Sequence, residues 1–154
     1  MRLALYQPDI PQNTGTILRM AACLRLGVDI IGPAGFAMSD RNLRRAGLDY
    51  LDHVEIVRHV DFERFDVARR AAGRRLVLLT THADGSYLEF AYGRDDTLLL
   101  GRESAGVPDA VRALADATLR IPIAAGLRSL NIAVAAAMVA GEALRQTGGF
   151  GSTA

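Results

Sequence analysis

Short apolar runs with strand character alternate along this chain with segments of helical periodicity. The strand-like runs cover residues 3–6, 28–31, 54–57, 76–80 and 97–100, and the helical patterns cover about 14–26, 39–46, 61–72, 108–115 and 130–146. Strands separated by helices pair in parallel and need cover on both faces. This order therefore predicts an α/β fold with a mostly parallel sheet and helices on both faces. Ligands bind such sheets beyond the carboxyl ends of the strands.

The length and composition predict one domain. With 154 residues, half of them hydrophobic, the chain can bury about two-thirds of its unfolded surface. We expect residues 1–148 to form this single domain and residues 149–154 to form a flexible tail. The sequence has no apolar run of about 18 residues and no secretory leader at its start, which favours a cytoplasmic location. Cys23 is the only cysteine, so no intrachain disulfide can form, and its apolar neighbours predict a buried thiol.

The polar residues exclude several common chemistries. All 18 basic residues are arginines, so the chain has neither a phosphate-binding lysine nor a Schiff-base lysine. The histidines lack metal-ligand spacing, and with one cysteine we expect no metal. Gly101 and Gly106 are spaced as in a triphosphate-binding loop, but Val107-Pro108 follows them. No G-x-G-x-x-G dinucleotide fingerprint is present either.

Three polar segments stand at the entrances to helices or at strand ends. Asn13 and Arg19 lie in the first helical pattern, where Asn13 is either an N-cap or a ligand contact, and Arg19 is either a surface charge or a buried group in need of a partner. Glu103 follows a strand, as a solvated turn carboxylate or a site residue. The segment from Ile121 to Asn131 passes through a glycine-containing loop, and its Ser129 is a plausible N-cap for the last helix.

The last helical pattern is apolar on every side. Residues 132–141 read Ile-Ala-Val-Ala-Ala-Ala-Met-Val-Ala-Gly. A helix without a polar face has to be covered all round. We interpret it as the interface of a homodimer, and the alternative is a central core helix.

Four motifs together carry a resemblance to a known family. They are the start Leu5-Tyr-Gln-Pro-Asp-Ile-Pro-Gln-Asn-Thr-Gly15, the segment Arg44-Arg-Ala-Gly-Leu-Asp-Tyr50, the turn Leu100-Gly-Arg-Glu-Ser-Ala-Gly-Val-Pro108, and the loop from Arg120 to Asn131. In this order they resemble the SPOUT-class tRNA (cytidine/uridine-2'-O-)-methyltransferases of the TrmL (YibK) type, over residues 1 to about 148. The resemblance implies a SPOUT fold with a deep trefoil knot at the carboxyl end, a homodimer through the last helix, and tRNA as the partner.

The same resemblance implies roles for individual residues and a reaction. The reaction is 2'-O-ribose methylation of the wobble cytidine or uridine in the anticodon loop, in leucine tRNA isoacceptors, with S-adenosyl-L-methionine as methyl donor. The implied cofactor-binding residues are Leu79, Gly101, Ile121, Ser129 and Leu130. The implied catalytic residues are Arg19, which activates the ribose hydroxyl, with Asn13, Glu103 and Asn131 shaping the pocket. The implied RNA-binding residues are Arg41, Arg44 and Arg45, which otherwise form a solvated helix face.

This sequence departs from the family pattern at a few places. Gln7-Pro-Asp9 stands where the family favours Glu-Pro-Glu, and Leu130 stands where it favours methionine. Gly141 and Leu144 replace a tyrosine and a tryptophan in the last helix, so the packing of the dimer should differ in detail.

Other functions remain open from the residues. An enzyme of the same fold could modify another site in tRNA or ribosomal RNA. A non-catalytic RNA-binding dimer is a second possibility, and a small-molecule α/β enzyme is a third. The missing phosphate-binding fingerprints disfavour the third.

Overall fold

The computed structural model describes residues 1–37 and 50–151, and of Leu51 only the backbone. The elements in chain order are β1 (Arg2–Tyr6), α1 (Pro11–Leu24), β2 (Gly27–Ile31), the short 3₁₀ helix η1 (Leu51–His53), β3 (Ile56–His59), α3 (Phe62–Ala71), β4 (Leu76–Leu79), β5 (Gly85–Ser86), β6 (Thr97–Leu100), α4 (Asp109–Arg112), β7 (Ala117–Arg120) and α5 (Ile132–Thr147). The helix expected at 39–46, with Arg41, Arg44 and Arg45, lies outside the described residues.

The strands form a seven-stranded sheet in the order β3-β2-β1-β6-β4-β7-β5. Every pairing in it is parallel, with β1 held between β2 and β6. Leu5 pairs with Ile30 on one side and with Leu100 on the other. The central strands are almost entirely apolar, as parallel strands buried on both faces are.

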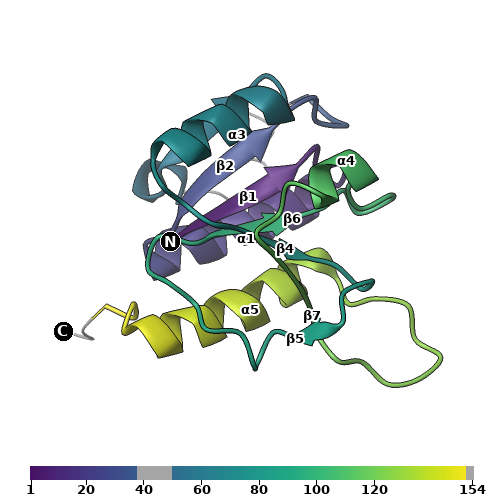
Figure 1. The fold of residues 1–154 in the computed structure, drawn as a ribbon. Helices are drawn as coiled ribbons and strands as arrows, with labels where there is room; N and C mark the ends of the chain where they lie inside the picture. The colour runs from purple at the N-terminus through teal and green to yellow at the C-terminus, as the bar shows by residue number, and fades with distance from the viewer. Residues whose placement is uncertain (38–49, 152–154) are drawn as a thin grey trace.

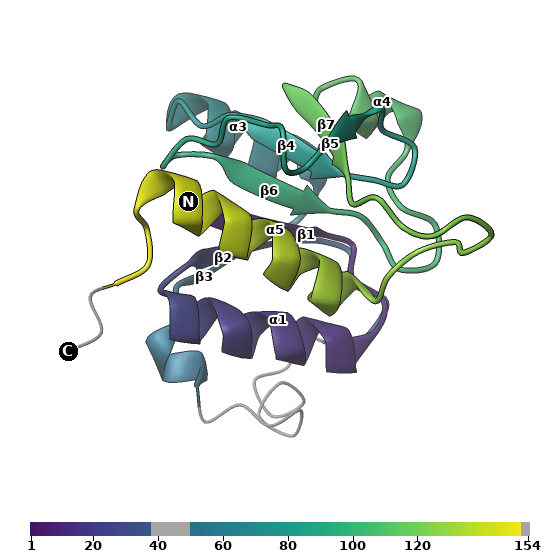
Figure 2. The same cartoon turned by 90° about the horizontal axis from the view of Figure 1, so that it is seen from below.

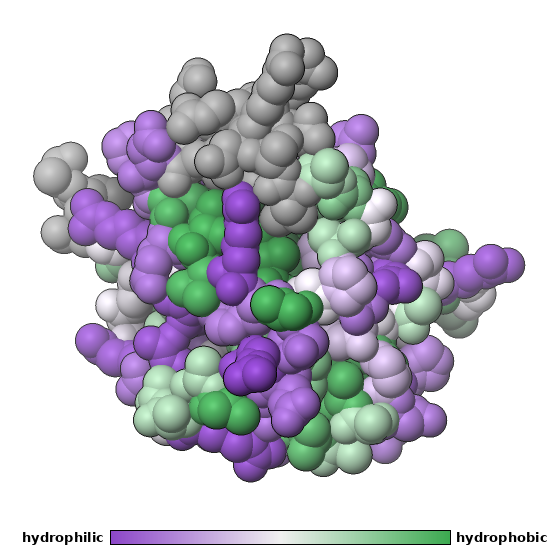
Figure 3. All heavy atoms as spheres, turned by 90° about the horizontal axis from the view of Figure 1, so that it is seen from above, coloured by the Kyte–Doolittle hydropathy of each residue, from purple (hydrophilic) through white to green (hydrophobic). Residues whose placement is uncertain are grey.

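Helices cover both faces of the sheet (Figures 1 and 2). Because side chains alternate along a strand, β1 sends Leu3 and Leu5 to one core and Ala4 and Tyr6 to the other. The first core lies against α1 and α5, which run side by side in Figure 2. The second lies against α3 and α4, with Phe65 at its centre. On the outer side of α3 and α4, hydrophilic side chains surround separate apolar patches (Figure 3).

The predicted fold class is confirmed, and the errors lie at the ends of elements. The strand expected at 54–57 is Ile56–His59, and the helix expected at 108–115 is only Asp109–Arg112. Strands β5 and β7 were not predicted, because neither contains an apolar run. The trefoil knot stays a prediction of the family resemblance.

Residues 132–141 of helix α5 are apolar all round but only half covered. Its buried positions include Ala136, Val139 and Ala140, which face the sheet and α1. Val134 and Met138 lie one turn apart on the other side, 49% and 38% exposed. The protomer therefore leaves an apolar strip of α5 in contact with solvent.

Candidate functional site

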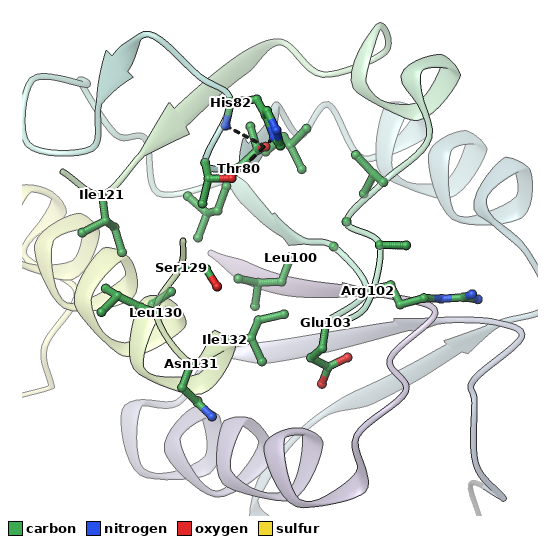
Figure 4. Close-up of a pocket in the computed structure, with 18 of the residues that line it drawn as sticks. Thr80, His82, Leu100, Arg102, Glu103, Ile121, Ser129, Leu130, Asn131 and Ile132 are labelled. Atoms are coloured by element: carbon green, nitrogen blue, oxygen red, sulfur yellow. Dashed lines mark hydrogen bonds between the residues drawn. The ribbon is translucent and has the colours of Figure 1, made fainter. Parts of the chain in front are cut away.

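A cleft of about 560 Å³ opens beyond the carboxyl ends of the strands (Figure 4). Its walls are formed by the segments that follow β4, β6 and β7 and by the approach to α5. Its volume lies in the range typical of small-molecule sites. Apolar side chains line its interior, among them Leu100, Ile121 and Ile132, while polar groups enter from the loops.

All the residues that the family resemblance assigns to the cofactor line this cleft. They are Leu79, Gly101, Ile121, Ser129 and Leu130. Figure 4 shows Ser129, Leu130 and Asn131 on the segment that leads into α5, at the wall of the cavity. Residues from four separate segments thus come together, and their role in binding the cofactor stays a prediction.

Asn131, and not Ser129, caps helix α5. The Oδ1 atom of Asn131 accepts hydrogen bonds from the backbone N–H groups of Ala133 at 2.8 Å and Val134 at 3.4 Å. The prediction for Ser129 was wrong because the helix begins two residues later than expected. Ser129 is consequently left without a capping role, and it is an exposed residue on the cleft wall.

Asn13, Glu103 and Asn131 form one hydrogen-bonded chain. The Nδ2 group of Asn131 donates to Oδ1 of Asn13 at 2.9 Å, and the Nδ2 group of Asn13 donates to Oε1 of Glu103 at 3.3 Å. The backbone N–H of Asp9 donates to Oε2 of Glu103 at 3.0 Å. The three residues come from α1, the loop after β6 and the head of α5. The chain of bonds therefore fixes these segments relative to one another.

The structure overturns the capping role of Asn13. Helix α1 begins at Pro11, and Ile10 occupies the N-cap position without a side-chain bond. Proline is tolerated at the first helical position, because the N–H group that it lacks would have no partner within the helix there. Asn13 therefore lies within the first turn, and its side chain is free to bond Asn131 and Glu103.

The two carboxyl groups beside this chain interact. Burial raises the pKa of Glu103 above its usual range, and hydrogen bonding with the Asp9 side chain raises it further. The same side-chain hydrogen bond lowers the pKa of Asp9, whose Oδ2 also accepts from the hydroxyl of Ser104. Among the described residues, Oδ1 of Asp9 is a buried atom without a partner.

The loop from Gly101 to Gly106 is closed on itself. The backbone N–H of Gly106 donates to the carbonyl of Arg102 at 2.7 Å, and that of Arg102 donates to the carbonyl of Gly106 at 2.9 Å. A Cβ atom at Gly101 would lie 2.7 Å from the carbonyl carbon of Gly106. Glycine is required at 101 because the two limbs of the loop meet there, and at 106 because φ is +66°.

Arg19 does not line the cleft of its own chain within the described structure. Its guanidinium lies over the ring of Tyr50, with Cζ 4.9 Å from the ring centre. It belongs to an exposed stripe of α1 that also carries Gln12, Thr16 and Cys23. Arg19 is therefore a surface charge with an aromatic partner, and the prediction that Cys23 is buried was wrong for the protomer.

Several cleft residues were not singled out from the sequence. Thr80, Thr81 and His82 follow β4, and the Oγ1 atom of Thr80 accepts from the backbone N–H of His82 at 3.3 Å (Figure 4). Their position after a strand could have indicated them. Arg112 and Arg128 also line the cleft, but neither stands in a position that the pattern of strands marks.

The described residues hold no group of three or more histidine, cysteine, aspartate or glutamate side chains that could bind a metal. The absence of a metal stays a prediction. Within the same part of the chain, no helix has the length and apolar character needed to cross a membrane.

Comparison with known proteins gives a consistent set of relatives. The model of the SpoU rRNA Methylase family matches residues 1–141. A tRNA (cytidine(34)-2'-O)-methyltransferase from Beijerinckia indica subsp. indica is 62% identical over 146 residues, covering 95% of this chain and 91% of the relative. The enzyme of the same name from Escherichia coli is 39% identical, covering 96% of this chain and 94% of the relative.

Two solved structures share the fold. One, described as giving structural insights into the 2-OH methylation of C/U34 on tRNA, has a TM-score of 0.88 and 43% identity and covers 94% of each chain. The other is the SpoU methyltransferase AviRb from Streptomyces viridochromogenes in complex with the cofactor AdoMet. It has a TM-score of 0.83 and 34% identity, and the match covers 95% of this chain and 60% of that one.

Proposed function

Because the chain belongs to the SpoU rRNA methylase family, we propose that it transfers a methyl group from S-adenosylmethionine to the ribose 2'-oxygen of the wobble nucleotide of tRNA. The observation that carries this proposal is the cleft, in which three of the four motifs, those at residues 5–15, 100–108 and 120–131, meet. Relatives that match nearly the whole chain are named for methylation of cytidine 34. Cytidine or uridine at that position, in leucine isoacceptors, is the proposed target.

The cleft suits S-adenosylmethionine. Its volume of about 560 Å³ is ample for a nucleoside with an amino-acid chain. Leu79, Ile121 and Leu130 offer an apolar surface for adenine. The loop from Gly101 to Gly106 offers backbone groups, and backbone binding tolerates changes of side chain. Ser129 stands at the rim with its hydroxyl free of the capping role.

The cofactor supplies an activated sulfonium methyl group. In the transfer, the bond between carbon and sulfur breaks, a bond between carbon and the ribose oxygen forms, and the electron pair stays on sulfur. The ribose hydroxyl loses its proton. The contribution of the protein is to hold the hydroxyl in line with the methyl group and to assist departure of this proton.

Arg19 is the proposed group that acts on the hydroxyl, as a cation and not as a general base. Deprotonating an arginine at pH 7 costs roughly 7–9 kcal/mol, because the guanidinium is a very weak acid. A charged guanidinium can instead bind an RNA phosphate and polarise the hydroxyl, and the proton leaves late to solvent or phosphate. An Arg19→Lys enzyme with undiminished turnover would exclude a need for the planar fork.

We propose that a second copy of the chain completes each site. Arg19 lies on the outer stripe of α1 and not in its own cleft, and the neighbouring α5 exposes Val134 and Met138. A homodimer packed on α5 would bury this strip and carry Arg19 of one copy toward the other. Such a dimer would work in the cytoplasm, where tRNA is modified. Arg41, Arg44 and Arg45 are the proposed contacts to phosphates of the anticodon stem.

The shared site has a direct test. An Arg19→Ala chain and a Ser129→Trp chain, each inactive by itself, should recover activity when mixed as a verified heterodimer. One site of that heterodimer then holds both intact residues. A heterodimer as inactive as its parents would exclude sharing.

The reaction is tested with purified protein, bulk tRNA and S-adenosylmethionine labelled in the methyl group. Nuclease mapping should place the label at the wobble 2'-oxygen, and Arg19→Ala should abolish it. Label at another nucleotide would show that the protein methylates a different RNA site. Cofactor binding without label on any RNA would favour a binding function.

A further inference from the structure

Arg112 has an unusual environment for a partly buried arginine. It is the last residue of α4, and its Nε atom is buried with no hydrogen-bond partner among the described residues. Other buried arginines are paired: Arg2 binds Asp29 and Glu55, and Arg69 binds Asp66 and Asp116. A buried donor without an acceptor is destabilising. An arginine kept in this position needs an acceptor that the described residues do not provide.

Arg112 borders the cleft, and it differs from the other two arginines there. Arg102 is occupied, since it donates to both the side-chain and the backbone oxygen of Gln7. Arg128 is exposed on the loop before α5, where it can meet a ligand that stays outside. Arg112 combines a position on the cleft wall with an unpaired donor below the surface.

We propose that Arg112 binds the carboxylate at the amino-acid end of S-adenosylmethionine. This inference rests on the proposed function, because it names a contact of the same cleft. A guanidinium binds a carboxylate with two parallel hydrogen bonds, and the Nε–H group forms one of them in the side-on geometry. That geometry requires an unpaired Nε. A small ligand inside the cleft can reach a buried donor, whereas phosphates of an RNA stay at the rim.

The contact would also orient the cofactor. With adenine against the apolar residues and the carboxylate on Arg112, both ends of the molecule are held. The sulfonium between them then has a fixed direction toward the ribose. Arg112 is in this sense a positioning residue for the transferred methyl group.

The experiment measures binding by isothermal titration calorimetry, with two ligands that differ only in the carboxylate. They are S-adenosylmethionine and decarboxylated S-adenosylmethionine, which keeps the adenine, the sulfonium and the amine. The wild-type chain should bind the decarboxylated compound about 10- to 100-fold more weakly, the range expected for a hydrogen-bonded ion pair. This comparison needs no variant.

The variant Arg112→Gln should remove this difference. Its affinity for S-adenosylmethionine should fall about 10- to 100-fold, and its affinity for the decarboxylated ligand should change less than about twofold. Arg112→Lys should recover part of the loss, since it keeps the charge but not the fork. Arg64→Gln, which removes an exposed arginine of α3, is the matched control and should bind both ligands as the wild type does.

Several results would overturn the inference. Equal affinity of the wild type for both ligands would do so, as would an equal loss of both ligands in Arg112→Gln. A variant that loses tRNA affinity but keeps S-adenosylmethionine affinity would move the contact to an RNA phosphate. No binding of S-adenosylmethionine to the wild type would instead refute the proposed function itself.

Discussion

Asn131 offers the sharpest test of how the site is built, because its two amide atoms have different tasks. Oδ1 caps α5 through Ala133 and Val134, and Nδ2 donates to Asn13. Loss of an N-cap costs about 0.5–2 kcal/mol, and loss of a neutral hydrogen bond about 0.5–1.5 kcal/mol. Asn131→Ala removes both and should lower the free energy of unfolding by about 1–3 kcal/mol.

Asn131→Asp separates the two tasks. Aspartate keeps the capping oxygen, and its charge is favourable at a helix N-terminus, but it cannot donate to Asn13. The Asp variant should therefore unfold in urea within about 1 kcal/mol of the wild type. It should still lose methyl transfer, because Asn13 and Glu103 lose their link to α5. If the Asp and Ala variants were equally destabilised, the cap would contribute nothing, and our reading of α5 would be refuted.

Four further changes probe other parts of the structure. Asp29→Asn removes the buried charge that pairs with Arg2 at 2.6 Å. The free energy of unfolding, measured by urea titration, should therefore fall by about 3–5 kcal/mol. A loss under about 1 kcal/mol would contradict this. Burial raises the pKa of Glu103, so its native state holds the proton more tightly than the unfolded chain. The stabilisation that protonated Glu103 provides is present below pH 4.5, the ordinary pKa of a glutamate, and is lost as the pH rises through the raised pKa. In the Glu103→Gln variant, the free energy of unfolding should fall less steeply as the pH rises through that window. An unchanged dependence on pH would show that Glu103 is not the group responsible. Gly101→Ala should weaken cofactor binding, because the added Cβ would lie 2.7 Å from the carbonyl carbon of Gly106. Gly141→Ala adds a Cβ that meets nothing within 4 Å, so it should stabilise α5 by about 0.5–1 kcal/mol.

The sequence was sufficient for the layers of the fold because hydrophobic periodicity is local. Residues 98–100, for example, are all leucine, and such a short apolar run is typical of a strand buried on both faces. Strand β7 escaped prediction because Ala117–Arg120 is only four residues long and contains no apolar run. Its pairing with β4 depends on the whole sheet, which local sequence does not contain.

The error at the start of α5 arose because two nearby residues of equal capping propensity cannot be ranked by propensity. Ser129 and Asn131 are both good N-caps. Asn131 takes the position, and it alone of the two carries an amide that can accept from the helix and also donate to Asn13. Cys23 is a different case. Helical geometry places it four residues from Arg19 on the exposed stripe, so its apolar sequence neighbours do not surround it.

The separation in sequence of the site residues explains why local patterns could not show that these residues lie together. Asn13 and Asn131 are 118 residues apart, and Asn13 and Glu103 are 90 apart. A hydrogen bond between such residues leaves no trace in periodicity, but the motifs that carry them recur together.

The chain of bonds also joins the cap of α5 to the loop that lines the cleft. A disturbance of α5, including loss of a partner on its exposed strip, should therefore reach the Glu103 loop through Asn131 and Asn13. A variant that dissociates a dimer on α5, such as Met138→Glu, should accordingly weaken S-adenosylmethionine binding in the isolated protomer, although Met138 itself does not line the cleft. Unchanged cofactor affinity in a verified monomer would show that the two regions are independent.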